Sequence, residues 1–228
     1  MKTRHDNVEY LELVLKKALN GLTGMDPSDE DIWKFYCEHS VLHWMVLGIN
    51  DFELELIRQI VMTDENFSDR ITALPKLSML KTCRACMQSQ ISSKGHFWYT
   101  RSQNIPGVHS CADHDEVLSV YQGSLVKAMQ DPGFSPDNNG ISSEADQAYA
   151  LFVHEYLASD LWIDSYTASI LIKNAGSNAI NQAAPYIRYI NENPKALDAT
   201  KDIPLCSKLL FTLWLCYGSV KDIQQKLA

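Results

Sequence analysis

The stretch KTCRACMQSQISSKGHFWYTRSQNIPGVHSCADHDEVL, Lys81 to Leu118, holds three of the six cysteines of this 228-residue chain. Two short pairs stand near its ends. Cys83 and Cys86 are separated by two residues, and Cys111 and His114 repeat that gap after a further twenty-four residues. A two-residue gap lets a tight knuckle direct both side chains to one point, and three thiolates with one imidazole complete a tetrahedron around Zn²⁺. The spacing predicts a Cys3His zinc site. Four protein ligands leave no open position for water, so the site is expected to be structural rather than catalytic.

Two other interpretations of these cysteines stay open at this point. A lone Cys-x-x-Cys pair is also typical of a redox centre, and buried cysteines often serve as small hydrophobic side chains. His96 and His109 are spare candidates for the metal. His109 stands two residues before Cys111 and is expected to pack beside the site.

Helical periodicity dominates the rest of the chain, and it predicts a mainly α protein. The period is lost over 82–113, where only HFWYTR at 96–101 has a strand-like pattern. The sequence thus predicts a helical protein with one inserted zinc-ribbon or knuckle-like module. We expect helices over 8–19, 28–48, 54–62, 69–80, 116–129, 143–158, 165–174, 177–191 and 205–217, with a short one from Ser219.

The same pattern divides the chain into regions. An N-terminal helical region covers 1–80, and the zinc module with its following helix covers 81–130. The Pro-, Gly- and Asn-rich segment 131–142 is the expected linker. The C-terminal helical region, 143–228, has two segments that resemble helix pairs of a helix-turn-helix, so we expect either a degenerate form of that motif or a plain helical hairpin.

Composition predicts a soluble, cytoplasmic protein with no membrane association. The N-terminus has no apolar core of a signal peptide. The longest apolar run, Leu209–Gly218, is about half of what a membrane-spanning helix needs. In the reducing cytoplasm, closely spaced cysteines are better explained as metal ligands than as disulfides.

Charge is unevenly distributed along this acidic chain. The net charge is −8, yet six basic residues and no acidic one lie between Arg70 and Ala112. An anionic partner would meet the protein at this basic island. The residues expected to contact nucleic acid or another partner are Lys81, Arg84, Lys94, Trp98, Arg101 and Gln103.

The spacer between the ligand pairs resembles the zinc module of the TniQ/TnsD family, the target-selection proteins of Tn7-like transposons. The matching elements, in the family's order, are Cys83, Cys86, Trp98, Tyr99, Arg101, Gln103, Pro106, Gly107, Val108, Cys111 and His114. The resemblance covers about forty residues and implies a non-enzymatic adaptor. Such an adaptor marks a DNA site, directly or through an RNA-guided complex, and recruits an AAA+ ATPase and a transposase.

A second hypothesis fits the acidic balance of the chain. The same zinc scaffold would then serve as an assembly protein of a mobile element or virus-related system and act through protein contacts. No catalytic constellation is recognisable in the sequence. His39 and His43 share a helix face without an HExxH pattern, Cys206 and Cys216 stand among large apolar residues, and His154-Glu155 has no assigned role.

Overall fold

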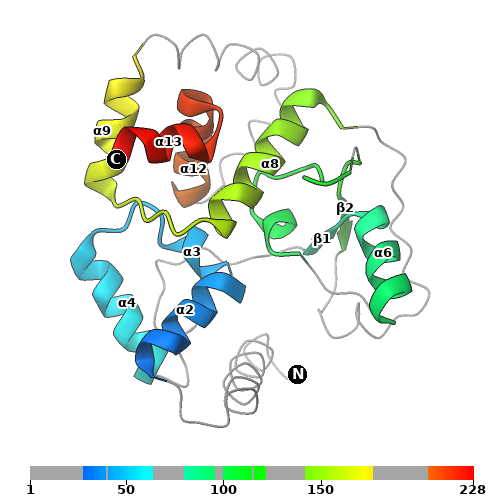
Figure 1. Ribbon diagram of the computed structural model, residues 1–228, viewed down its shortest axis with the longest axis horizontal. Coiled ribbons are helices and arrows are strands. Elements are labelled where there is room, and N and C mark those ends of the chain that lie inside the picture. Colours follow the sequence, from blue (N-terminus) through cyan, green and yellow to red (C-terminus); the bar gives the residue numbers. More distant parts are fainter. Residues whose placement is uncertain are drawn as a thin grey trace, which may run out of the picture.

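The computed structural model describes residues 28–39, 41–63, 80–95, 100–114, 116–121, 142–176 and 205–228 (Figure 1). Within these ranges the protein is mainly helical, as predicted. The helices predicted over 8–19, 69–80 and 177–191 and the linker over 131–142 fall outside the described residues, apart from residues 80 and 142. The helices are α2 (Asp29–His39), α3 (Leu42–Met45), α4 (Asp51–Thr63), α6 (Arg84–Lys94), α8 (Glu144–Ala158), α9 (Ser165–Ala175), α12 (Leu205–Tyr217) and α13 (Val220–Leu227), with one 3-10 turn, η1 (Ser102–Asn104).

Polar caps fix the starts of several helices. The hydroxyl of Ser28 accepts a hydrogen bond from the Asp31 amide at 3.2 Å and caps α2. Ser143 and Ser219 do the same for α8 and α13. Each cap satisfies an amide that has no partner within its own helix, which stabilises the helix by about 1 kcal/mol. The helices α8, α9 and α12 start and end within one residue of their predicted bounds, and α13 starts one residue after its predicted start.

The single helix predicted over 28–48 is instead two helices, α2 and α3. The chain bends around Val41, and Trp44 then points into the main core, where its indole N–H donates to the Ser207 hydroxyl at 3.1 Å. Trp33 and Tyr36 pack in a smaller cluster with Ile57 of α4. The bend lets residues 28–48 contribute side chains both to the main core and to the smaller cluster. Tertiary packing therefore outweighs helix propensity here.

Gly48 lies where the end of this region passes close to Ile163 and Leu209. Its φ is +82°, and its amide donates to the Ile163 carbonyl at 2.9 Å. A Cβ at this position would lie 2.7 Å from Leu209 Cδ2 of α12. Only glycine suits both the left-handed backbone and the contact.

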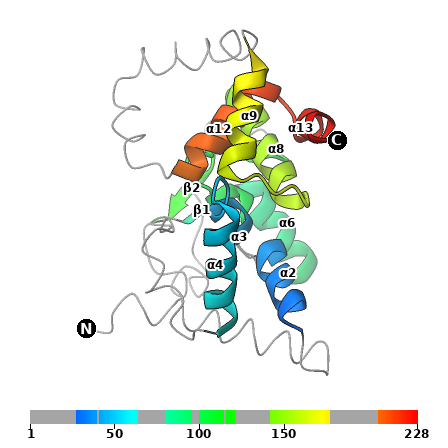
Figure 2. The same ribbon diagram turned by 90° about the vertical axis from the view of Figure 1, so that its left-hand side faces the viewer.

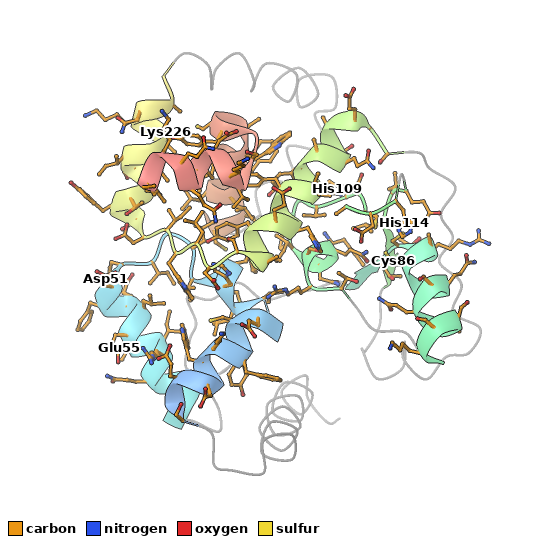
Figure 3. All side chains as sticks on the ribbon, viewed as in Figure 1. Asp51, Glu55, Cys86, His109, His114 and Lys226 are labelled. Carbon is orange, nitrogen blue, oxygen red and sulfur yellow. The ribbon has the colours of Figure 1, made fainter. Side chains whose placement is uncertain are left out.

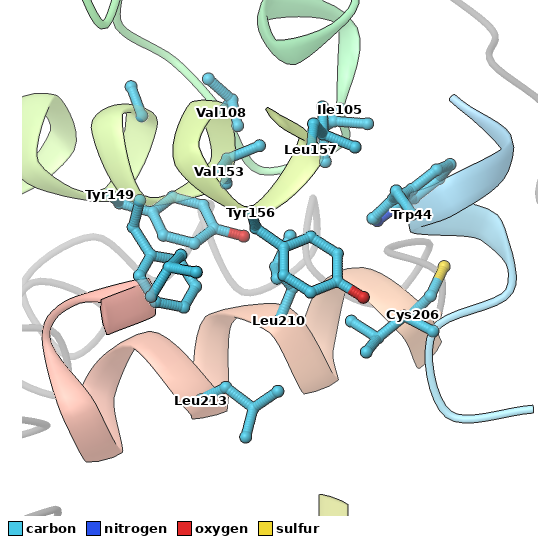
Figure 4. Packing of buried hydrophobic residues seen from close by; sticks show 14 of the residues in the cluster. Trp44, Ile105, Val108, Tyr149, Val153, Tyr156, Leu157, Cys206, Leu210 and Leu213 are labelled. Atoms are coloured by element: carbon cyan, nitrogen blue, oxygen red, sulfur yellow. The ribbon is translucent and has the colours of Figure 1, made fainter. Parts of the chain in front are cut away.

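The main core is built on α8 and α12, which pack against each other with Tyr156 and Leu210 between them, while Leu213 points to the other side of α12 (Figure 4). α12 also packs against α3, α9 and α13. Trp44 and Leu47 come from the N-terminal region and Ile105 and Val108 from the cysteine region, so segments from three of the predicted regions share this core. Each fully buried side chain of this size contributes about 1.5–3 kcal/mol.

A small antiparallel sheet supports the cysteine region. Strand β1 (Leu80–Thr82) pairs with β2 (Ser119–Tyr121), with Lys81 opposite Val120. The prediction of a helix over 116–129 is therefore wrong at its start. Residues 119–121 form a strand there, and their backbone groups hydrogen-bond to the partner strand β1. Residues 122–129 lie outside the described part of the chain.

A second correction concerns 82–113, where no helix was predicted and α6 runs from Arg84 to Lys94. Met87 is the one residue of α6 that is buried, so its hydrophobic period is weak. The helix ends at Gly95, whose φ of +77° is a left-handed C-cap. Of the strand-like segment 96–101, residues 100 and 101 are described and form no strand.

Figure 1 places the cysteine region to one side of α8, and in the turned view of Figure 2 this region lies at the back of the molecule. Helices α2, α3 and α4 lie below the C-terminal helices in Figure 1, and α6 stands at the outer edge of the molecule. None of the helices in the described ranges is both long and apolar enough to cross a membrane.

Candidate metal centre

The first pair of cysteines lies where β1 passes into α6. Cys83 is the N-cap residue of the helix, with extended backbone angles, and Cys86 lies in the first turn. The sequence pattern predicted a loop knuckle here, and the structure has a helix start instead. A helix N-terminus carries a partial positive charge and exposed amide groups, both of which stabilise thiolates.

The second pair lies on the turn of a tight antiparallel loop. Ser110 bridges to Val117, the Cys111 amide donates to the Glu116 carbonyl at 3.0 Å, and the Leu118 amide donates to the His109 carbonyl at 2.7 Å. Cys111 and His114 face the start of α6 across this turn. Cys86 and His114 lie next to each other between α6 and the strands (Figure 3).

The four predicted ligand residues converge on one point. Their ligand atoms all lie within 4.8 Å of one another. His114 Nδ1 lies 3.6 Å from Cys83 Sγ, 3.4 Å from Cys86 Sγ and 3.5 Å from Cys111 Sγ. The Sγ atoms of Cys86 and Cys111 are 3.5 Å apart, well beyond the disulfide bond length of about 2.05 Å, and all six cysteines are free. This Cys3His cluster can hold a metal ion.

Protons in the cluster are shared unequally. Hydrogen bonds from the Cys83 and Cys86 thiols lower the pKa of Cys111. The hydrogen bond to Cys111 raises the pKa of Cys83, and the same kind of contact raises the pKa of Cys86 to about 11. Binding of a metal ion would release protons from the cysteine thiols, which makes metal affinity dependent on pH.

Gln103 forms hydrogen bonds with both pairs of ligand residues. Its Nε2 donates to Cys86 Sγ at 3.4 Å and to Cys111 Sγ at 3.5 Å, while its Oε1 accepts from the Cys83 amide at 3.1 Å. The side chain is 3% exposed. Predicted from the sequence as a partner-binding residue, Gln103 lies in the interior, where it orients the cysteine ligands.

Glu116 is a part of the centre that sequence reasoning missed. Its Oε2 lies 3.3 Å from Cys83 Sγ and accepts from the Ala85 amide at 3.3 Å. The carboxylate thus caps the first turn of α6 from across the loop. The sequence signal for Glu116 was its position two residues after His114. Its contact with Cys83, however, depends on how the loop that carries His114 folds onto α6.

Two of the predicted partner-binding cations make internal contacts. Lys81 Nζ donates to the carbonyls of Ile105 at 2.7 Å and Val108 at 2.5 Å, and burial lowers the pKa of Lys81 to about 7. Arg101 donates to the Cys37 carbonyl at 2.7 Å and to the Leu157 carbonyl at 2.5 Å. Lys81 thus stabilises the segment that leads to Cys111, and Arg101 connects the start of that segment to α2 and α8.

The remaining predicted partner residues have a different placement. Arg84 and Lys94 are exposed at opposite ends of α6. Trp98, like Tyr99 and His96, lies outside the described residues. The spare histidine His109 is exposed and is not one of the residues of the Cys3His cluster.

The other cysteines and histidines do not join a second cluster within the described ranges, where the Cys3His group is the one set found that could hold a metal. Cys206 and Cys216 are buried in apolar surroundings, and burial raises the pKa of each thiol. His43 is buried in α3 and donates from Nε2 to the Leu161 carbonyl at 2.8 Å. His154 Nδ1 lies 3.4 Å from the Ser102 hydroxyl.

Comparison with known proteins gives no family assignment: no protein-family model matches the chain, and no curated protein matches it significantly.

Proposed function

We propose that Cys83, Cys86, Cys111 and His114 bind one zinc ion. A tetrahedral zinc ion with Zn–S near 2.3 Å and Zn–N near 2.0 Å places sulfur and nitrogen about 3.5 Å apart. The observed separations between His114 Nδ1 and the three sulfurs, 3.4 to 3.6 Å, fit that value. Three thiols and one imidazole are also a ligand set that zinc prefers.

The proposed zinc ion has a structural role. When bound, it would join the start of α6 to the 110–117 loop, and these elements have few other apolar contacts because Met87 is the one buried residue of α6. Four protein ligands leave no coordination position for a substrate. We therefore propose a binding protein rather than an enzyme.

The exposed side of α6 is the surface that we propose for an anionic partner. The helix has no acidic residue, and it presents Arg84 and Lys94 to solvent together with polar residues such as Gln88 and Ser92. Because α6 begins on two of the zinc ligands, the metal would hold this surface in place. This observation supports a TniQ-like adaptor that contacts DNA or an RNA-guided complex through α6 and recruits an AAA+ ATPase or transposase.

Salt-dependent binding to duplex DNA tests this proposal. In the zinc-loaded full chain, the double variant Arg84→Gln/Lys94→Gln should bind more weakly. The slope of log K against log salt should fall by about 2, since each lost phosphate contact removes about 0.9. The matched control is Lys173→Gln/Lys208→Gln, which removes the same charge from exposed positions of α9 and α12. Equal losses in both double variants would mean that α6 is not the contact surface.

A repurposed scaffold or assembly protein remains the second candidate function. The internal contacts of Lys81 and Arg101 favour it, because they leave the basic island with fewer charges for phosphates. A zinc-loaded chain with no affinity for DNA or RNA at low salt would support this candidate over the adaptor.

A further inference from the structure

Trp162 is held rigidly although it lies partly at the surface. Its side chain is 40% exposed. The residues on either side of it are fixed through their carbonyls: His43 Nε2 donates to Leu161 at 2.8 Å and the Gly48 amide donates to Ile163 at 2.9 Å. A large aromatic side chain on an anchored loop loses little conformational entropy on binding, which is a property of interface hot spots.

Aromatic neighbours hold the Trp162 ring from inside the protein. The His43 ring lies 4.8 Å from Trp162 on one side and 4.8 Å from Tyr156 on the other, measured between ring centroids. The Trp33 ring of α2 stacks on Trp162 at 6.0 Å. Tyr156, His43, Trp162 and Trp33 form a continuous row of rings in which Trp162 is the exposed member.

Two hollows flank this pair of tryptophans, and both are lined by Trp33 and Trp162. We call them the tryptophan pockets. One has a volume of about 350 Å³ and lies toward α4, and the other has about 250 Å³ and lies toward the end of α8. Cavities for drug-sized ligands measure about 300–1,000 Å³. The tryptophan pockets are at or below the low end of that range, a size that suits single side chains.

The charges around the tryptophan pockets favour a cation. Of the three cations in their walls, Arg58 pairs with Glu30, Lys34 pairs with Glu38 and Arg101 donates to backbone carbonyls. The side chains of Asp51 and Asp160 accept no hydrogen bond from any residue that the structure describes. Asp51 and Glu55 lie on α4, across the molecule from Cys86 and His114 (Figure 3). The carboxylates that line the two pockets are Glu30, Glu38, Asp51, Glu55 and Asp160.

We propose that the tryptophan pockets bind a basic segment of a partner protein, with an arginine or lysine side chain in each pocket. The indole rings of Trp33 and Trp162 would cover the aliphatic stems, and the carboxylates of Asp51, Glu55 and Asp160 would face the charged ends. Phosphates would be repelled at this face, so the surface is distinct from the one proposed on α6. The inference rests on the proposed function in one respect, since an adaptor needs a protein partner.

A peptide that alternates arginine and leucine, blocked at both ends, is the probe for this proposal. Its matched control carries citrulline, the uncharged isostere, in place of each arginine. Titration calorimetry with the zinc-loaded full chain should show binding of the arginine peptide alone. Trp162→Ala should raise its Kd about 10-fold or more and Asp160→Asn about 3-fold. Tyr166→Ala, which removes a 73% exposed aromatic residue outside the pockets, should leave the Kd unchanged.

Three results would overturn the inference: no binding of the arginine peptide at millimolar concentration, equal binding of the citrulline peptide, or an unchanged Kd in both Trp162→Ala and Asp160→Asn. Asp160 is exposed, so its variant keeps the test valid if Trp162→Ala alters the fold. The Arg84→Gln/Lys94→Gln variant should bind the peptide normally. The peptide-binding test and the DNA-binding test can therefore fail independently of each other.

Discussion

Replacing Gln103 by leucine distinguishes a residue that supports the metal centre from one that binds a partner. Leucine has a similar volume but lacks the carboxamide, so Gln103→Leu removes the two N–H···S contacts of 3.4 and 3.5 Å and leaves the Cys83 amide without its acceptor. An unsatisfied buried N–H costs about 1–3 kcal/mol. Loss of a partner that orients metal ligands typically weakens metal binding about 10–100-fold.

We expect Gln103→Leu to lower zinc affinity by about 10–100-fold in competition with a chelating dye under reducing conditions. The unfolding free energy of the metal-loaded protein, from urea titration, should fall by about 2–4 kcal/mol. Gln88→Leu makes the same chemical change at an exposed position of α6 and should stay within about 0.5 kcal/mol. If Gln103→Leu matched Gln88→Leu in both measurements, the placement of Gln103 behind the sulfurs would be refuted.

Two further predictions concern the helical part of the protein. Gly48→Ala should lower the unfolding free energy by about 1–3 kcal/mol in urea titration, because alanine is strained at φ +82° and its Cβ would meet Leu209 Cδ2 at 2.7 Å; an unchanged value would contradict the contact. Burial lowers the pKa of His43 from 6.5, so below about pH 6.5 the unfolded chain binds more protons and the stability due to neutral His43 is lost as pH falls. The stability advantage of the wild type over His43→Phe should therefore shrink between pH 7.5 and 5.5, whereas a constant difference would show that His43 titrates normally.

The sequence was a good guide wherever the signal is local. Helices were expected to start at Ser143 and Ser219, and each serine caps its helix because its hydroxyl bonds an amide three residues away. The ligand spacing likewise identified residues that converge in space. The helix α6 was missed because Met87 is its one buried residue, which leaves little hydrophobic period to detect.

What the sequence could not supply was the environment of each polar residue. Lys81 and Arg101 were counted as surface charges, yet both donate to carbonyls of distant segments. Gln103 contacts sulfurs 8 and 17 residues away, and Glu116 contacts a sulfur 33 residues away. The tryptophan pockets bring together Trp33 and Trp162, which are far apart in the sequence, and no periodicity or motif marks that pairing.

The presence of a zinc ion at the Cys3His cluster can be measured from the metal content of the freshly purified, reduced full chain. We expect one zinc ion per chain, with X-ray absorption showing three sulfurs near 2.3 Å and one nitrogen near 2.0 Å. The His114→Ala chain should lose the nitrogen and hold the metal more weakly. Protein that carries no metal, or metal whose shell contains no sulfur, would contradict the account.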